Sequence, residues 1–173
     1  MPELVLRPTV PRDVRAVIAI EQHPEVGKWA GQWDSAGHMA AIAADNAKHL
    51  VMVDEIDEVI GYGILTDLFN VDDNVEFKRI ALARWGEGIG QAFVEAMLAQ
   101  AFSIPSVHRV WLDVVSTNFA AVAVYVQAGF QREGTMRQAY FDRSANDGRI
   151  DMYLMSILRP EWERSKVSAA PEN

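Results

Sequence analysis

The sequence contains no cysteine among its 173 residues. This absence excludes disulfide bridges, zinc sites built on thiolates, and any mechanism that passes through an acyl-cysteine intermediate. Basic residues are also scarce, because 16 lysines and arginines stand against 24 aspartates and glutamates, a formal net charge of −8 at pH 7. Such a balance argues against a general surface for nucleic acid or anionic membranes. We therefore expect neither nucleic acid nor membrane as a partner.

Long apolar runs are missing as well. No stretch approaches the ~18 uninterrupted apolar residues of a membrane span, and residues 1–7 lack the basic start and apolar run of a signal peptide. We therefore expect a cytoplasmic protein. Half of the residues are apolar, which is enough for a packed core. The length fits one domain, which we expect over residues 1–158, followed by a polar C-terminal tail over 159–173.

Apolar periodicity and turn residues predict the order of secondary-structure elements. The expected order is a strand, two helices, three strands, a helix, a strand, a helix and two strands. Their predicted ranges are 3–7, 11–22, 35–48, 50–53, 59–65, 75–82, 89–100, 108–115, 118–127, 130–141 and 149–158. This order predicts a mixed sheet in an α/β or α+β layer fold.

Three glycines, Gly86, Gly88 and Gly90, lie where a predicted strand is followed by a helix. Glycine lets backbone N–H groups turn toward one point and lets a ligand approach closely. The first turn of a helix leaves N–H groups unpaired and carries partial positive charge. The cluster therefore predicts a phosphate cradle formed by the amides of residues 87–91.

The glycine cluster alone has competing interpretations. A P-loop requires Lys followed by Ser or Thr after the last glycine, whereas Gln91 and Ala92 follow here. The dinucleotide fingerprint Gly-x-Gly-x-x-Gly fails in both registers, although Asp113 stands roughly where a ribose-binding acid would. A glycine-rich turn that binds nothing is the third interpretation.

A second group of residues lies on the helix predicted at 118–127. Asn118 and Tyr125 are seven residues apart, so their side chains share one face. The opposite stripe, which we expect to supply core residues, consists of Phe119, Val122, Ala123 and Val126. Gly129 is placed to end the helix.

With both groups in this order, the sequence resembles the GNAT superfamily of acetyl-CoA-dependent N-acetyltransferases. The family pattern is a strand, an R/Q-x-x-G-x-G/A loop with its helix, another strand, and N-x-x-(A)-x-x-x-Y-x-x-x-G-F. It is matched here by residues 77–82, 88–90, 118–125 and 129–130. Segments between residues 133 and 158 resemble the branch that includes ribosomal-protein N-terminal acetyltransferases. The resemblance spans residues 3–158 and implies a mostly antiparallel sheet of six to seven strands flanked by about four helices.

The resemblance implies transfer of acetyl directly from acetyl-CoA to a primary amine, either a small molecule or a protein N-terminus. It implies that backbone groups of Ile80, Ala81 and Leu82 hold the pantetheine arm and the thioester carbonyl. The pyrophosphate would lie on Glu87, Gly88, Ile89, Gly90 and Gln91, and Asn118 would bind the pantetheine or thioester region. Tyr125 is the matched general acid, which would protonate a thiolate whose conjugate acid has a pKa near ~8.5.

One position departs from the family pattern, because Trp85 stands where Arg or Gln is usual and Arg84 is one residue early. Gln91 or Arg84 could replace the missing side-chain contact to the pyrophosphate. A non-catalytic acyl-CoA-binding module is therefore the alternative function. Binding of a nicotinamide dinucleotide is the third possible function. It would be recognised because NAD, and not coenzyme A, would protect the protein.

Glu76 is the candidate base for the protonated amine. Strand alternation predicts that Glu76, Lys78 and Ile80 share one face, and that Phe77 and Arg79 share the other. The alternative, which the sequence favours equally, is that Glu76 is not a base and instead pairs with Lys78 or faces solvent.

Aromatic residues are candidates for the acceptor site. Trp29 and Trp33 either line the acceptor pocket or cap the core, and Tyr140 is a further candidate. The histidines show no ligand spacing with each other or with carboxylates, so we expect no metal; they are His23, His38, His49 and His108. The last two strands could pair between subunits, which makes a homodimer an open expectation.

Overall fold

The computed structural model describes residues 4–29, 31–86, 88–142 and 148–168. The strands are β1 (Val5–Pro8), β2 (Ala47–Val53), β3 (Val59–Thr66), β4 (Asn74–Leu82), β5 (Arg109–Val115), β6 (Gln131–Phe141) and β7 (Arg149–Leu158). The helices are α1 (Val14–Gln22), α2 (Pro24–Gly27), α3 (Ser35–Ala43), α4 (Ile89–Phe102), α5 (Phe119–Gln127) and α6 (Arg159–Ser168), with a 3-10 turn, η1 (Pro11–Asp13).

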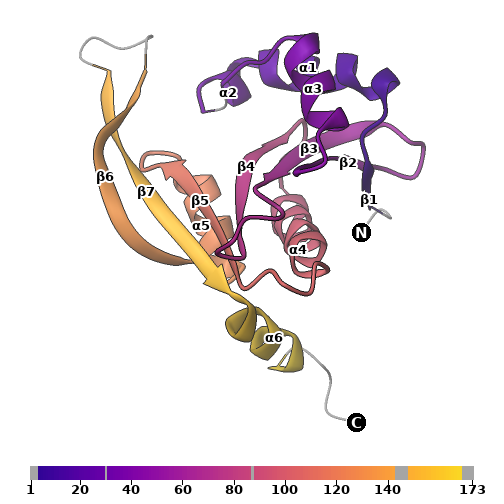
Figure 1. The fold of residues 1–173 in the computed structure, drawn as a ribbon. Helices are drawn as coiled ribbons and strands as arrows, with labels where there is room; N and C mark the ends of the chain where they lie inside the picture. The colour runs from indigo at the N-terminus through magenta and orange to yellow at the C-terminus, as the bar shows by residue number, and fades with distance from the viewer. Residues whose placement is uncertain (1–3, 30, 87, 143–147, 169–173) are drawn as a thin grey trace.

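All seven strands join one sheet in the order β1-β2-β3-β4-β5-β7-β6 (Figure 1). Neighbouring strands are antiparallel except for β4 and β5, which run parallel. The parallel pairing covers only residues 74–76 against 109–111, and beyond it the two strands diverge. The sheet therefore has a V-shaped opening between β4 and β5, which we call the β4–β5 opening. The prediction of a mixed, mostly antiparallel sheet with as many as seven strands is confirmed.

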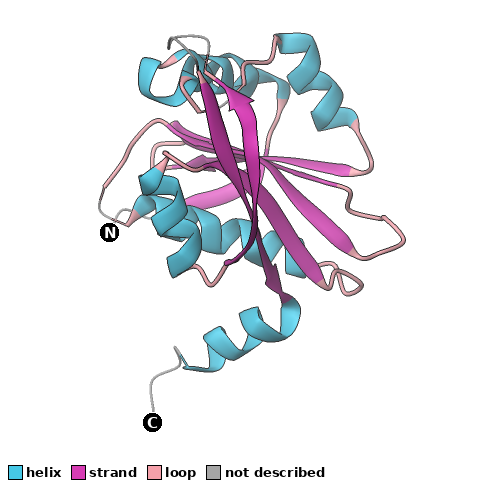
Figure 2. Ribbon diagram, turned by 90° about the vertical axis from the view of Figure 1, so that its left-hand side faces the viewer, coloured by secondary structure: helices cyan, strands magenta, loops and turns pink. Residues whose placement is uncertain are grey.

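Helices cover both faces of this sheet (Figure 2). Helices α4 and α5 lie on one face above a large apolar cluster that includes Phe93, Met97 and Leu112. Helices α1 and α3 lie on the other face, where a smaller cluster includes Val17 and Ile64. In the described part of the chain, no helix is both long and apolar enough to cross a bilayer.

Two glycines set how closely α4 approaches its neighbours. A Cβ on Gly63 of β3 would lie 2.5 Å from Cε of Met97, so α4 packs against bare backbone at this position. A Cβ on Gly90 would lie 3.5 Å from a methyl group of Val124, which places the first turn of α4 beside α5. Helix α5, which carries Tyr125, therefore packs beside the start of α4.

A β-bulge changes the predicted faces of β4. Arg79 pairs with Ile64 and Phe77 pairs with Leu65, so Lys78 is an extra residue in the ladder. Phe77 and Ile80 consequently both pack on the α4 face, whereas Arg79 reaches Glu21 on the α1–α3 face. The prediction that Phe77 and Arg79 share one face is therefore wrong, as is the grouping of Ile80 with Glu76.

Three other predictions need correction. Helix α3 ends at Ala43, not near Lys48, and its N-cap is Asp34, whose carboxylate accepts the N–H of Gly37 at 2.8 Å. On α5, Phe119, Ala123 and Val126 face outward, whereas the helix packs with a set that includes Ala121, Val122, Val124 and Tyr125.

The segment expected to be a frayed tail begins as helix α6. The Arg159 guanidinium donates to the carbonyls of Phe102, Ile104 and Val107, at 2.7–3.0 Å. The Trp162 ring stacks on Phe102, with ring centres 4.9 Å apart. These contacts satisfy carbonyls at and after the C-terminal end of α4, and this stabilises a helix whose own composition is mostly polar.

Candidate active site

One edge of β4 is open along the β4–β5 opening. Ile80, Ala81 and Leu82 pair with β3 on one side, but the described residues of β5 pair only with residues 74–76. An open strand edge offers N–H and C=O groups to an extended ligand. These are the backbone groups to which the family resemblance assigns the pantetheine arm, and they lie at the opening.

The glycine turn leads from this edge into α4. Gly86 and Gly88 have φ of +93° and +76°, and Gly88 is the N-cap of the helix. A Cβ added at either glycine would meet nothing within 4 Å, so the turn is open to a ligand. The N–H of Ile89 donates to the Gly86 carbonyl at 3.1 Å, so this donor is already used within the turn.

The remaining predicted cradle residues divide into two groups. Gly90 and Gln91 stand in the first turn of α4, where backbone N–H groups have no acceptor within the helix. Glu87 lies outside the described residues. An open turn at a helix N-terminus fits a phosphate group, so the residues present are compatible with the pyrophosphate of coenzyme A.

Neither proposed replacement for the family Arg or Gln is directed to the pyrophosphate. Arg84 forms ion pairs with Asp54 at 3.2 Å and Glu58 at 2.7 Å. The Gln91 amide nitrogen donates to Glu95 at 2.9 Å. Trp85 is 56% exposed. The glycine turn therefore offers backbone donors in place of a side chain.

Asn118 and Tyr125 stand near the two ends of α5, the helix that packs beside the first turn of α4. The Asn118 side-chain oxygen accepts the N–H of Ala121 at 3.2 Å, so Asn118 is the N-cap of α5. The Tyr125 ring is half-buried and contacts Phe130, with ring centres 5.7 Å apart. Burial raises the pKa of the Tyr125 phenol above its usual value, and the charge of Asp113 raises it further. Tyr125 consequently keeps its proton at neutral pH.

Two carboxyl groups lie near the start of the opening. Glu76 accepts hydrogen bonds from Thr66 at 3.0 Å and from Lys78 at 3.3 Å, so the pairing with Lys78 that the sequence left open is present. Partial desolvation raises the pKa of Asp113, whose side chain remains exposed, and the charge of the nearby Glu76 also raises it. Electrostatic interactions therefore connect Asp113 both with Glu76 and with Tyr125.

The described residues of the α2–α3 loop (28, 29 and 31–34) contact β4 on one side and β6 on the other. The Trp33 ring packs against the smaller cluster and lies under the Arg79 guanidinium, 4.4 Å from its centre. Arg79 also donates to the Gly31 carbonyl. From the other side, the Tyr140 hydroxyl of β6 donates to the Lys28 carbonyl at 2.6 Å. The loop therefore reaches from β4 to β6, past the intervening opening, and Trp29 lies within it.

The sequence analysis missed a buried polar network on the α1–α3 face. Glu21 accepts hydrogen bonds from Tyr62, Arg79 and the N–H of Trp33, and lies 3.5 Å from Nε2 of His38. His38 contacts His49 at 3.0 Å, and His49 contacts Thr9 at 2.8 Å. The sequence analysis considered the histidines only as metal ligands, and it did not predict that His38 and His49 would lie together beside Glu21.

One sequence signal pointed to this network, because Glu21 interrupts the apolar stripe of Val14, Val17 and Ile18. Within the described residues, no group of three or more acidic or histidine side chains is arranged to hold a metal ion.

Comparisons with known proteins agree with this arrangement. A family model described as an acetyltransferase (GNAT) domain matches residues 3–131. Spermidine N(1)-acetyltransferase of Vibrio cholerae is 28% identical over 120 residues, 68% of either chain. The [ribosomal protein bS18]-alanine N-acetyltransferase of Escherichia coli is 31% identical over 90 residues, 52% of this chain and about half (53%) of that enzyme.

The same fold is found in solved structures. The crystal structure of spermidine N-acetyltransferase from Vibrio cholerae in complex with CoA and spermine superposes with a TM-score of 0.82 at 22% identity, and covers 92% of this chain and 98% of that one. The family model covers well over half of this chain. The chain therefore belongs to the GNAT acetyltransferase family and is an N-acetyltransferase with acetyl-CoA as its donor.

Proposed function

We propose that this enzyme transfers acetyl directly to a cationic primary amine that enters the β4–β5 opening from the α1–α3 face. The observation that carries this proposal is the opening itself, with an open strand edge and a glycine turn on one side and two carboxyl groups at its start. Both named relatives acetylate amines, which supports the same class of acceptor.

Acetyl-CoA supplies an activated thioester. The backbone of Ile80, Ala81 and Leu82 would bind and orient its arm, and the amides of Gly88, Gly90 and Gln91 would bind its phosphates. Backbone donors do not depend on the net charge of the chain. This is how a protein with a formal charge of −8 can hold a polyanionic donor.

Tyr125 would deliver a proton to the leaving sulfur. Its raised pKa keeps the phenol protonated at neutral pH and lies above that of a thiol, so the transfer is uphill and would occur only together with cleavage of the carbon–sulfur bond, after which the phenolate would regain a proton from solvent. The absence of cysteine supports direct attack of the amine on the thioester, without an acyl-cysteine intermediate.

Glu76 would receive the proton that the amine loses, directly or through water. Each of its oxygens accepts one hydrogen bond, from Thr66 or from Lys78, so the carboxylate is oriented and still has lone pairs for a proton. We expect Glu76→Gln to shift the acidic limb of the pH–rate profile. An unchanged profile would exclude Glu76 as the base.

Thiol release from acetyl-CoA with a panel of amines tests the proposed function. The panel should contain polyamines, amino acids and a peptide with an N-terminal alanine, because the relatives act on a polyamine and on a ribosomal protein. We expect turnover with at least one amine and a KM that falls at low salt, since acidic groups attract the cation. Binding of coenzyme A without turnover would instead support the non-catalytic module.

A further inference from the structure

Glu21 is a buried side chain on the α1–α3 face whose carboxylate accepts three hydrogen bonds. It is 0% exposed and lies at the C-terminal end of α1. One carboxylate oxygen accepts the N–H of Trp33 at 2.8 Å, and the other accepts hydrogen bonds from Arg79 at 3.0 Å and from the Tyr62 hydroxyl. A buried carboxylate is tolerated only when it is paired and hydrogen-bonded in this way.

The bulge in β4 is what brings Arg79 to Glu21. Val75 and Phe77 face the apolar α4 side, and strict alternation would direct Arg79 to that side too. The extra residue Lys78 reverses the alternation, so the guanidinium reaches the α1–α3 face instead. There it contacts Glu21, the Gly31 carbonyl and the face of the Trp33 ring together.

Glu21 and Arg79 contact each other and also contact the α2–α3 loop. Glu21 holds the N–H of Trp33, while Arg79 holds the carbonyl of Gly31 and the Trp33 ring. On the far side, Tyr140 holds the Lys28 carbonyl. The opening lies between β4 and β5, and β7 and then β6 follow β5 in the sheet, so the contacts of the loop with β4 and with β6 lie on opposite sides of the opening, where an amine would enter if the proposed function holds.

We propose that Glu21 is a positioning residue of the acceptor site, which acts with Arg79 to fix the α2–α3 loop and the Trp33 ring beside the β4–β5 opening. Glu21 does not touch the reacting atoms. It sets the position of the loop against which the amine binds, so its loss affects binding of the amine more than binding of acetyl-CoA.

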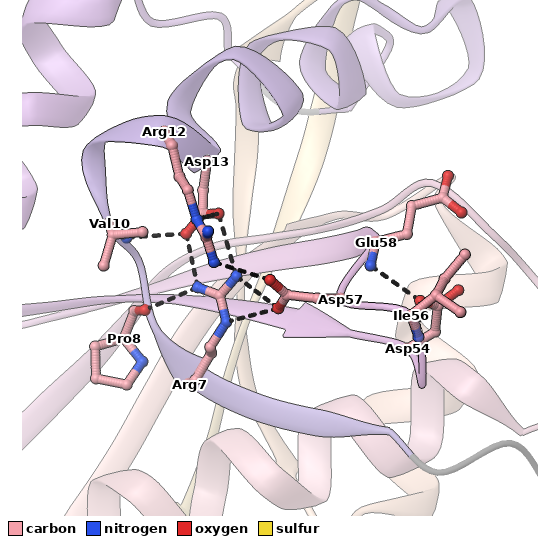
Figure 3. Close-up of polar contacts among 9 residues, drawn as sticks. All are labelled: Arg7, Pro8, Val10, Arg12, Asp13, Asp54, Ile56, Asp57 and Glu58. Carbon is pink, nitrogen blue, oxygen red and sulfur yellow. Dashed lines mark hydrogen bonds and ion pairs between the residues drawn. The ribbon is translucent and has the colours of Figure 1, made fainter.

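The chain offers a matched control at the other end of α1 (Figure 3). Asp13 is also buried, at 5% exposed, with an arginine partner, Arg7, at 2.7 Å and a backbone N–H, that of Val10, at 2.9 Å. This group ties together η1, β1 and the β2–β3 turn through Asp57, and none of its drawn contacts reaches the α2–α3 loop. Asp13→Asn therefore removes a comparable buried charge without touching the loop.

The test compares Glu21→Gln, Arg79→Lys and Asp13→Asn. In Glu21→Gln we expect the amine KM to rise about tenfold, the size of one charge-assisted hydrogen bond, with the acetyl-CoA KM changed less than about twofold. Arg79→Lys keeps the charge but loses the planar fork, so it should raise the amine KM by a smaller factor. If Glu21→Gln fails to fold, Arg79→Lys still tests the proposal. Asp13→Asn should leave both KM values near those of the wild type.

Hydrogen exchange of the Trp33 backbone amide, followed by NMR, is the readout independent of activity. We expect exchange at least about tenfold faster in Glu21→Gln, and unchanged in Asp13→Asn, because only the former replaces the charged carboxylate that accepts this N–H by a neutral amide with a single acceptor oxygen. Equal exchange in both variants, or faster exchange without a change in amine KM, would overturn the proposal. A wild-type chain without turnover would refute the proposed function, while the exchange measurement would still decide whether Glu21 anchors the loop.

Discussion

On the α4–α5 face of the sheet, buried side chains form one continuous apolar cluster, and chemistry is offered by backbone groups at the glycine turn and the edge of β4. On the α1–α3 face, the apolar cluster is smaller and shares its space with buried Glu21, His38 and His49. Apolar packing is non-directional, whereas a buried polar network depends on every partner being present. The donor side of this enzyme should therefore tolerate changes of pH and charge that disturb the acceptor side.

The largest expected effect on the free energy of unfolding comes from removing apolar packing on the α4–α5 face. Phe93 of α4 is fully buried in the larger cluster, so Phe93→Ala should lower the free energy of unfolding by about 3–5 kcal/mol. Urea denaturation measures this change. Phe69, which is 69% exposed, is the control, and Phe69→Ala should change the free energy of unfolding by less than about 0.5 kcal/mol. Similar losses in the two variants would show that the larger cluster is not the main source of stability.

The next largest expected effect is the pH dependence of stability that His49 gives to the α1–α3 face. Burial, together with a smaller effect of the neighbouring His38, lowers the pKa of His49 from 6.5 to about 4. The unfolded chain therefore takes up this proton at higher pH than the folded one. The stability that His49 contributes is complete above pH 6.5 and is lost as the pH falls toward 4, by up to about 3 kcal/mol.

Wild type and His49→Gln should be compared by urea denaturation at pH 7 and pH 4.5. Asp13, Asp54 and Glu133 have lowered pKa values, so they also lose stabilisation as the pH falls, but equally in both proteins. We expect the wild type to lose more stability than the variant over this range. Parallel losses would show that His49 does not carry the pH dependence of this face.

The same contrast explains what the sequence could predict. Apolar periodicity places the strands and the long helix α4 within a few residues, because burial on one face imposes a regular spacing. The positive φ values of Gly86, Gly88 and Gly129 also fit their predicted places in turns, since glycine adopts that backbone conformation without strain.

Features that depend on contacts between distant segments could not be predicted in this way. The bulge at Lys78 is set by the register between β3 and β4. His38 and His49 lie on different elements, and only the path from α3 to β2 brings their rings together. Helix α6 depends on carbonyls more than 50 residues away in the chain. In each case the deciding partner is distant in sequence, and local composition contains no record of it.

The last test asks whether the apolar face contributes any side-chain chemistry. Tyr125 projects from α5 beside Phe130, and its hydroxyl is the group there that we assign to proton transfer. Tyr125→Phe keeps the ring and its packing, and removes only the proton donor. We expect kcat to fall by about 10²-fold, equivalent to ~2.7 kcal/mol, as is usual for loss of a general acid, with the acetyl-CoA KM nearly unchanged.

Tyr153 of β7 provides the control for this variant. Its ring packs against the same cluster and lies under the Arg132 guanidinium at 3.8 Å, so Tyr153→Phe repeats the chemical change away from the glycine turn. It should leave kcat within about twofold of the wild type. If Tyr125→Phe behaves in the same way, Tyr125 is a packing residue, and the proton reaches the sulfur from the acceptor side, where Glu76 and Asp113 lie. The polar face would then supply all of the proton chemistry, and the apolar face would do no more than hold the donor.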